Sequence, residues 1–275
     1  MSAATAPKYE RVKAMTLDPD RKEIARYLGY HGIRPDAEIE EEIELCVEQL
    51  GQVVTPRFVY EKFDITVDEN AGEVGMAGFV IRSRDLAKNL RGCKAAYLMA
   101  VTLGPGPDAL VRRASIGRMS RAVILQAAAA AMVEVWCDEI NARILREAAR
   151  DGLYPARPRF SPGYGDLPLD WQRQISALLN MPKEIGVSLT DTLLMTPSKS
   201  VTAFVGVTDS KSQNTAGGAN TDKDSGRTAD GANTDIDSGR TAGVCGEEEQ
   251  KTYLPGGHSC RACSMADTCA YSKSE

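Results

Sequence analysis

The chain has 275 residues, with 33 basic and 38 acidic side chains and a net charge of −5. Apolar residues make up 43% and charged residues 26%, which is ordinary for a globular protein and excludes a wholly disordered chain. The acidic balance argues against nucleic-acid binding. No apolar run reaches the ~20 residues of a membrane-spanning helix, and the N-terminus lacks a signal segment. We therefore expect a cytoplasmic protein without nucleic-acid or membrane partners.

Helices are predicted over the first part of the chain. Residues 8–54 are expected to be helical, and Pro35-Asp36 is typical of a helix start. Beyond it, apolar residues recur three or four positions apart, as on one face of a helix, at Ile39, Ile43, Cys46 and Leu50. The glutamates between them are expected to face solvent.

Strands and helices alternate in the following 150 residues. Strands are predicted over residues 57–67, 73–82 and 94–103, and the last is so apolar that we expect it in the centre of a sheet. A long helix is predicted over 119–151, a turn-rich stretch over 155–168, a helix over about 170–180, and strands over 187–195 and 200–207. Regular βαβ units are missing, which predicts an α+β fold: a mixed or antiparallel twisted sheet with a long central helix and flanking helices, plus a flexible insert and a small Cys-rich C-terminal tail.

The long predicted helix contains an unusual carboxylate. Its first half is rich in alanine, which allows another backbone to pack closely. Glu134 lies between Val133 and Val135 in this apolar half. A carboxylate on a mostly buried helix needs a partner, and the purely structural interpretation of Glu134 is a salt bridge to an arginine elsewhere in the fold.

The composition changes after residue 207. Residues 208–243 are mostly small and polar, and they contain two 13-residue repeats, GANTDKDSGRTAD and GANTDIDSGRTAG, that agree at eleven positions. They hold too few apolar side chains to build a core. We therefore expect a folded domain over residues 1–207, a linker over 208–244 and a Cys-rich tail over 245–275.

The turn-rich stretch contains the first candidate site, the run RFSPGYGDLP over residues 159–168. Its prolines restrict the backbone, and Gly163 allows a ligand to come close. Arg159 can hold a carboxylate with two hydrogen bonds, and Tyr164 adds a flat apolar face with a hydroxyl. By themselves these residues fit either a small-molecule site or an ordinary proline-rich loop.

This loop resembles the S-adenosylmethionine-binding activation domain of cobalamin-dependent methionine synthase. That family carries an Arg-x-x-x-Gly-Tyr-x-x-x-Pro loop, which is matched by Arg159, Gly163, Tyr164 and Pro168. Its downstream Met-x-Pro-x-x-Ser-Val stretch is matched by Met195, Pro197, Ser200 and Val201. The glutamate on the long helix of the family aligns best with Glu134, and the resemblance spans roughly residues 20–207.

The resemblance implies a protein that binds S-adenosylmethionine and supports the reductive methylation, or reactivation, of a cobalamin-dependent methyltransferase such as methionine synthase. Arg159 would hold the methionine carboxylate, Glu134 would meet a polar or cationic part of the ligand, and Gly163 and Tyr164 would line the pocket. No residue would act as an acid, base or nucleophile, because the cofactor supplies that chemistry. The chain would take part in a methyl-transfer system without being the synthase itself.

The same resemblance implies two partners. The sequence lacks the Asp-x-His-x-x-Gly signature of a cobalamin-binding module, so the cobalamin would be carried by a separate corrinoid protein. A further protein would donate the electron that reactivation consumes. Two alternatives stay open: a corrinoid- or cofactor-binding chaperone or electron carrier without methyl transfer, and a methyltransferase of unrelated substrate. The second is disfavoured because no Gly-x-Gly loop follows the first predicted strand.

Four of the seven cysteines gather in the last 31 residues, at Cys245, Cys260, Cys263 and Cys269. The odd total and this clustering are unlike a disulfide framework. Thiolates at this spacing can converge on an iron–sulfur cluster or on zinc, with His258 as an alternative fourth ligand. Redox-active thiols and free thiols are the other interpretations.

Overall fold

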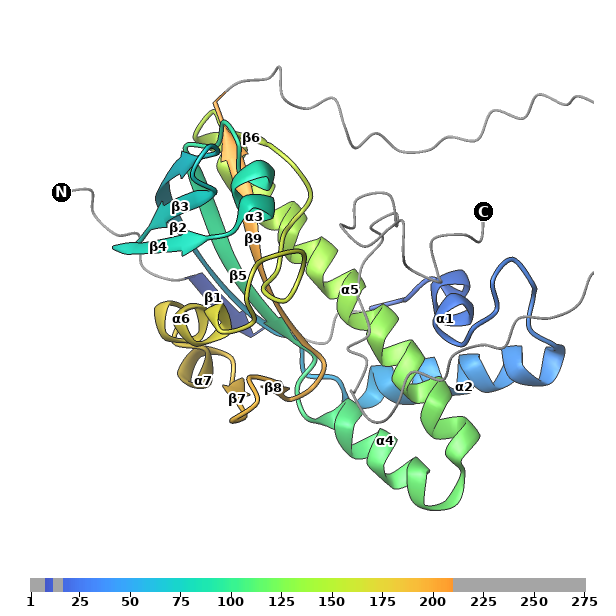
Figure 1. The fold of residues 1–275 in the computed structure, drawn as a ribbon. Helices are drawn as coiled ribbons and strands as arrows, with labels where there is room; N and C mark the ends of the chain where they lie inside the picture. The colour runs from blue at the N-terminus through green and yellow to red at the C-terminus, as the bar shows by residue number, and fades with distance from the viewer. Residues whose placement is uncertain (1–7, 12–16, 210–275) are drawn as a thin grey trace, which may run out of the picture.

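The computed structural model describes residues 8–11 and 17–209, and Figure 1 shows how its elements are arranged. The predicted Cys-rich tail, with Cys245, Cys260, Cys263 and Cys269, lies outside these residues, as does nearly all of the predicted linker. Among the described residues, no helix is both long and apolar enough to cross a membrane.

An antiparallel sheet forms the centre of the fold, with the strand order β4-β3-β2-β5-β9-β6 and with β1 beside the first half of β2. Its strands are β1 (Lys8–Arg11), β2 (Arg57–Asp68), β3 (Glu73–Met76), β4 (Phe79–Arg82), β5 (Ala95–Thr102), β6 (Tyr154–Pro155) and β9 (Ser200–Thr208). A separate two-stranded ribbon pairs β7 (Ser188–Leu189) with β8 (Met195–Thr196). This arrangement confirms the predicted α+β class with an antiparallel sheet.

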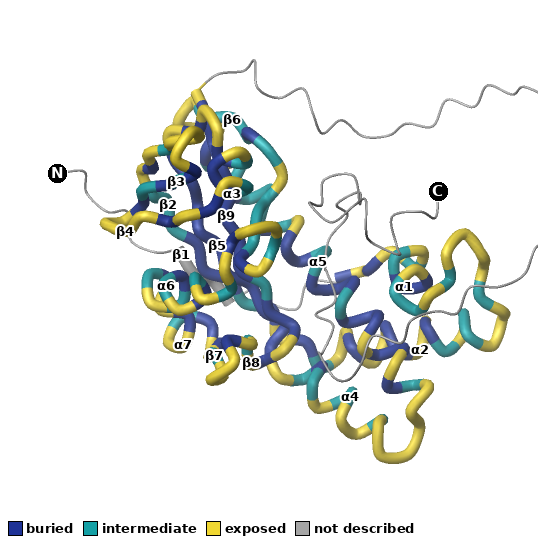
Figure 2. The backbone as a smooth tube through the Cα atoms, viewed as in Figure 1, coloured by how far each residue is buried: buried dark blue, intermediate teal, exposed yellow. Residues whose placement is uncertain are grey.

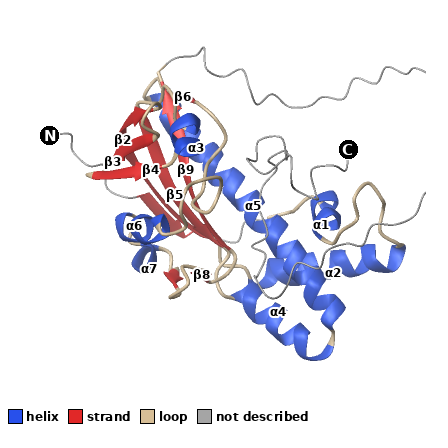
Figure 3. Cartoon of the chain, viewed as in Figure 1, coloured by secondary structure: helices blue, strands red, loops and turns tan. Residues whose placement is uncertain are grey.

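The described residues form seven helices, and Figure 3 separates them from the strands. They are α1 (Arg21–Tyr27), α2 (Ala37–Val53), α3 (Arg84–Asn89), α4 (Gly106–Gly117), α5 (Met119–Arg150), α6 (Trp171–Leu178) and α7 (Met181–Glu184). Helix α5 matches the predicted long helix within one residue. It runs behind the sheet and continues beyond it toward α2 and α4 (Figure 1).

The central strand β5 divides the core into two layers. Every residue of β5 is buried, which confirms its predicted central position, and Figure 2 shows the same burial along the middle of the sheet. Successive side chains point to opposite faces of a strand. Tyr97, Met99 and Val101 therefore pack with α5, while Ala96, Leu98 and Ala100 pack with residues of α3, α6 and α7.

Three predictions of local structure were wrong. Residues 8–11 form a strand instead of a helix, because they find a partner in Arg57–Tyr60 of β2. Residues 73–82 form the hairpin β3–β4 instead of one strand, with Ala77 and Gly78 both at positive φ in its turn. Residues 187–195 form two short strands that are separated by a turn at Thr190–Leu194.

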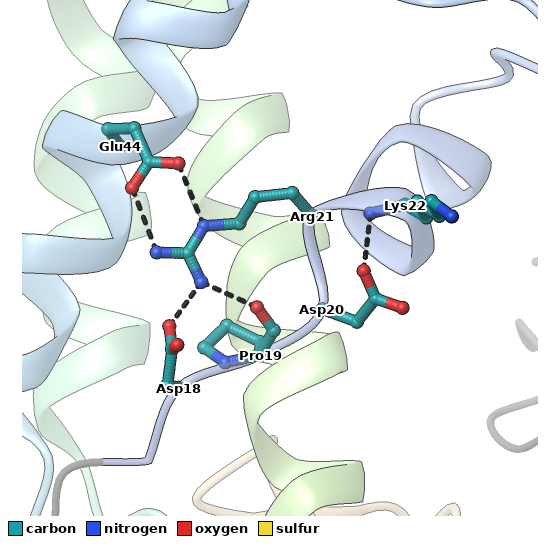
Figure 4. A network of polar contacts seen from close by, with 6 residues as sticks. All are labelled: Asp18, Pro19, Asp20, Arg21, Lys22 and Glu44. Carbon is teal, nitrogen blue, oxygen red and sulfur yellow. Dashed lines mark hydrogen bonds and ion pairs between the residues drawn. The ribbon is translucent and has the colours of Figure 1, made fainter.

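Helix α1 is fixed to α2 by a network around Arg21 (Figure 4). The Nε and Nη2 atoms of Arg21 each lie 2.8 Å from an oxygen of Glu44, and Nη1 contacts Asp18 and the carbonyl of Pro19. The Asp20 side chain caps α1 by accepting the N–H of Lys22 at 2.9 Å. This network positions α1, which also packs on α5.

Candidate functional site

The loop over residues 156–169 and helix α5 meet through Arg159. Its Nη2 lies 2.5 Å from Oε2 of Glu134, and its Nη1 lies 2.6 Å from Oδ1 of Asp138. Glu134 and Asp138 are four residues apart, so both project from one face of the helix. The predicted salt bridge of Glu134 is therefore confirmed, and its partner is the arginine of the turn-rich loop.

The three charged side chains differ in burial. Those of Arg159 and Glu134 are only 18% and 15% exposed, whereas that of Asp138 is 71% exposed. Burial by itself lowers the pKa of Arg159, but the neighbouring Asp138 and Glu134 carboxylates outweigh it and raise that pKa above its ordinary value. The guanidinium stays charged at any physiological pH, with a sheltered side toward Glu134 and an open side toward Asp138.

The charges of Glu134 and Arg159 also act on Tyr164. Burial raises the pKa of its phenol, and the negative charge of Glu134 raises it further. Cys137, one helical position after Trp136, is fully buried, and burial raises the pKa of its thiol as well. Both groups are therefore neutral at pH 7.

One end of the loop is joined to the sheet. Phe160 and Phe204 exchange backbone hydrogen bonds, of 3.0 Å for the N–H of Phe160 and 2.7 Å for the N–H of Phe204. Farther along, the N–H of Gly163 donates to the carbonyl of Leu167 at 2.9 Å. Gly163 has φ +90°, a conformation that side-chain-bearing residues rarely adopt, so glycine is needed to form this turn.

The other end of the loop is joined to α3 through Asp166. Its carboxylate accepts the hydroxyl of Ser83 at 2.5 Å and the N–H groups of Arg84 and Asp85 at 2.8 and 3.2 Å. In return, Asp85 accepts the N–H of Asp166 at 3.1 Å. This cap over the start of α3 fixes the segment that directly follows Tyr164.

The downstream motif takes a different position. The Ser200 hydroxyl lies 2.8 Å from Thr102 Oγ1 and 2.7 Å from the carbonyl of Pro197. Ser198 binds Asp108 of α4 through its N–H and hydroxyl. In the described part of the chain, no hydrogen bond or ion pair joins this junction to Arg159. Pro197 and Ser200 therefore organise the start of β9, while Met195 belongs to β8 and Val201 pairs with Val101 of β5.

The sequence predicted Glu134, Arg159, Gly163 and Tyr164 as site residues. It did not predict the roles of Asp138, Asp85 and Asp166. The i, i+4 spacing of Glu134 and Asp138 was a usable signal, since such residues share a helix face. Nothing in the sequence pairs Asp85 with Asp166. Within residues 17–209 no group of His, Cys, Asp and Glu side chains could hold a metal ion.

The cluster fits a small ligand that carries charges of both signs. A guanidinium with several N–H groups can bind a carboxylate in the fork geometry. Two carboxylates beside it favour a cationic group, and the phenol and loop backbone add polar contacts. The part-buried position of Arg159 and Glu134 makes their interactions stronger than they would be in open solvent, whereas those of the exposed Asp138 are screened by water.

Comparison with known proteins shows the family and the fold of the chain. The family model described as "Vitamin B12 dependent methionine synthase, activation domain" matches residues 21–223. A solved structure with a similar fold is the crystal structure of the MetH reactivation domain bound to AdoHcy. It has a TM-score of 0.53 and 16% sequence identity, and the match covers 74% of this chain and 79% of that chain. No match was found among curated proteins.

Proposed function

The chain belongs to the family of the vitamin B12 dependent methionine synthase activation domain, and on this basis we propose that it binds S-adenosylmethionine and presents it to a cobalamin-carrying methyltransferase for reactivation. The observation that carries the proposal is the ion pair between Arg159 of the family loop and Glu134 of α5. It supports the proposal because Arg159 and Glu134, whose ligand-binding roles are implied by the resemblance, are part-buried side by side rather than in bulk water.

The ligand matches the cluster group by group. Arg159 holds the carboxylate of the methionine moiety, because a guanidinium carries more N–H groups than the two that bond to α5. Glu134 meets a polar or cationic part of the ligand, and Tyr164 lines the pocket. The positive φ of Gly163 lets the loop backbone come close to the ligand.

The protein's contribution is placement rather than acid–base chemistry. Cobalamin on the partner would supply the methyl-accepting chemistry, with an electron from a separate donor protein, while Arg159, Glu134, Gly163 and Tyr164 of this chain would hold the methyl donor. The chain holds the ligand at its amino-acid end through Arg159 and Glu134. These contacts leave the sulfonium end of the ligand facing the cobalamin-carrying partner.

Titration calorimetry with S-adenosylmethionine tests the proposal. We expect the wild type to bind, and Arg159→Ala to weaken binding at least tenfold, about 1.4 kcal/mol. Arg146→Ala is the matched control, because Arg146 also lies on α5 but pairs with Glu139 at 3.4 Å. Absence of heat with the folded wild type would overturn the proposal and favour a chaperone or electron carrier without methyl transfer.

We further propose that the cobalamin belongs to a separate polypeptide in the cytoplasm.

We also propose that the C-terminal cysteines bind an iron–sulfur cluster or zinc. The support for this metal site is the spacing of Cys260, Cys263 and Cys269, with Cys245 as a fourth thiolate. Anaerobic purification followed by iron and zinc analysis decides between the metals, with absorption at about 400 nm expected for a cluster. Cys263→Ser should release the metal, and a metal-free wild type would leave only redox-active or free thiols.

A further inference from the structure

The site carries more negative than positive charge. One guanidinium, that of Arg159, faces two carboxylates, those of Glu134 and Asp138. Tyr164 and Cys137 add no charge, since burial raises the pKa of both groups. These groups together therefore have a net charge of −1, and the excess lies toward the exposed side chain of Asp138.

The substrate and product of the proposed reaction differ in charge far more than in shape. S-adenosylmethionine has a carboxylate, an ammonium group and a sulfonium, which add up to +1. Loss of the methyl group leaves a neutral thioether, so the product has a net charge of zero. A nearby fixed charge distinguishes such a pair directly, because Coulomb energy acts on the sulfonium and vanishes for the thioether.

We propose that Asp138 is a specificity-determining residue that makes the site prefer the cationic sulfonium substrate over its neutral thioether product. This inference rests on the proposed function and adds to it a residue and a selectivity. Glu134 balances the charge of Arg159 at the sheltered side of the site, and Asp138 supplies the carboxylate in excess. Transfer of the methyl group removes the attraction, so the product is held less tightly than the substrate was.

The different burial of the two carboxylates separates their roles. Glu134 is 15% exposed, and its removal would leave the similarly buried Arg159 without its buried counter-charge. The loss would weaken the binding of every ligand that Arg159 holds. Asp138 is 71% exposed, so its own ion pair with Arg159 adds little to stability. Substitution of Asp138 therefore changes the field at the site while Glu134 still positions the guanidinium.

The test compares the affinities of the full-length protein for S-adenosylmethionine and S-adenosylhomocysteine by titration calorimetry. In Asp138→Asn we expect S-adenosylmethionine to bind on the order of three- to tenfold more weakly, and S-adenosylhomocysteine to change less than about twofold. The matched control is Glu139→Gln, because it removes a carboxylate one position away that pairs with Arg146 instead of Arg159. High salt should reduce the preference of the wild type and leave that of Asp138→Asn nearly unchanged.

The outcomes separate this inference from the function on which it rests. A wild type that binds neither ligand overturns both. A wild type that binds, together with an Asp138→Asn variant that keeps the wild-type preference, overturns the inference alone. Equal weakening of both ligands in Asp138→Asn also overturns it, since that result means Asp138 acts only by positioning Arg159. Thermal unfolding of each variant checks that the fold is retained.

Discussion

Asp85 and Asp166 cap each other's backbone across 81 positions of the chain. The carboxylate of Asp166 accepts the N–H of Asp85, and the carboxylate of Asp85 accepts the N–H of Asp166. The pair joins α3 to the loop that holds Arg159 and Tyr164, while Phe160 joins the same loop to β9. The site is therefore built on a loop that is fixed at two points instead of one.

Loss of the Asp166 cap should loosen this loop. Asp166→Ala removes three hydrogen bonds at the start of α3, and we expect it to lower the free energy of unfolding by about 1 kcal/mol. It should also weaken S-adenosylmethionine binding, because Tyr164 lies two residues away. Urea unfolding measures the first effect. Asp170→Ala is the control, since Asp170 precedes α6 without a side-chain cap bond, and an equal loss there would contradict the role given to Asp166.

The contribution of Asp166 should depend on pH. Burial raises the pKa of its carboxyl, but the Ser83 hydroxyl and the N–H groups of Arg84 and Asp85 outweigh burial and hold the pKa below its ordinary value. A lowered pKa in the folded state means stability that is present above the unfolded pKa and is lost as the pH falls through the folded one. The difference in unfolding free energy between wild type and Asp166→Ala should therefore shrink from about pH 7 to about pH 3. A difference that stays constant over this range would show that the charge of Asp166 is irrelevant.

A side chain at residue 165 should displace the loop from α3. Gly165 has φ +53°, and a Cβ there would lie 2.2 Å from Oδ2 of Asp85. Gly152 has φ +73° with open space around it, so Gly152→Ala measures the backbone strain without the collision. We expect Gly165→Ala to lower the unfolding free energy by about 1 kcal/mol more than Gly152→Ala does. Equal effects in thermal or urea unfolding would mean that the loop moves aside freely.

Three cysteines of the core should resist modification in the folded protein. Burial raises the pKa of Cys46 and Cys93 to about 11 and that of Cys137 in the same direction, so little thiolate exists at neutral pH. Iodoacetamide at about pH 8 should leave all three unmodified in the native state and alkylate them in guanidinium chloride. Peptide mass spectrometry gives the result for each residue. Rapid native alkylation of Cys137 would contradict its burial against the site.

The sequence alone determined the features that arise from local patterns. The apolar repeat over residues 119–151 located α5 within one residue, and the unbroken apolar run over 94–103 placed β5 in the centre of the sheet. The family loop and the need of Glu134 for a cationic partner were also readable, because both depend on residue type and short spacing. Weak local signals failed: residues 8–11 became a strand only because β2 offers them a partner.

Only the tertiary structure decided which side chains meet. Arg159 reaches Asp138 across 21 positions and Glu134 across 25, and Asp85 reaches Asp166 across 81. No periodicity encodes such pairs, because their geometry follows from the packing of the loop between α3, α5 and β9. The sequence thus supplied the charges, and the fold decided that Arg159 and Glu134 share a part-buried position where Coulomb forces are weakly screened, with the exposed carboxylate of Asp138 beside them.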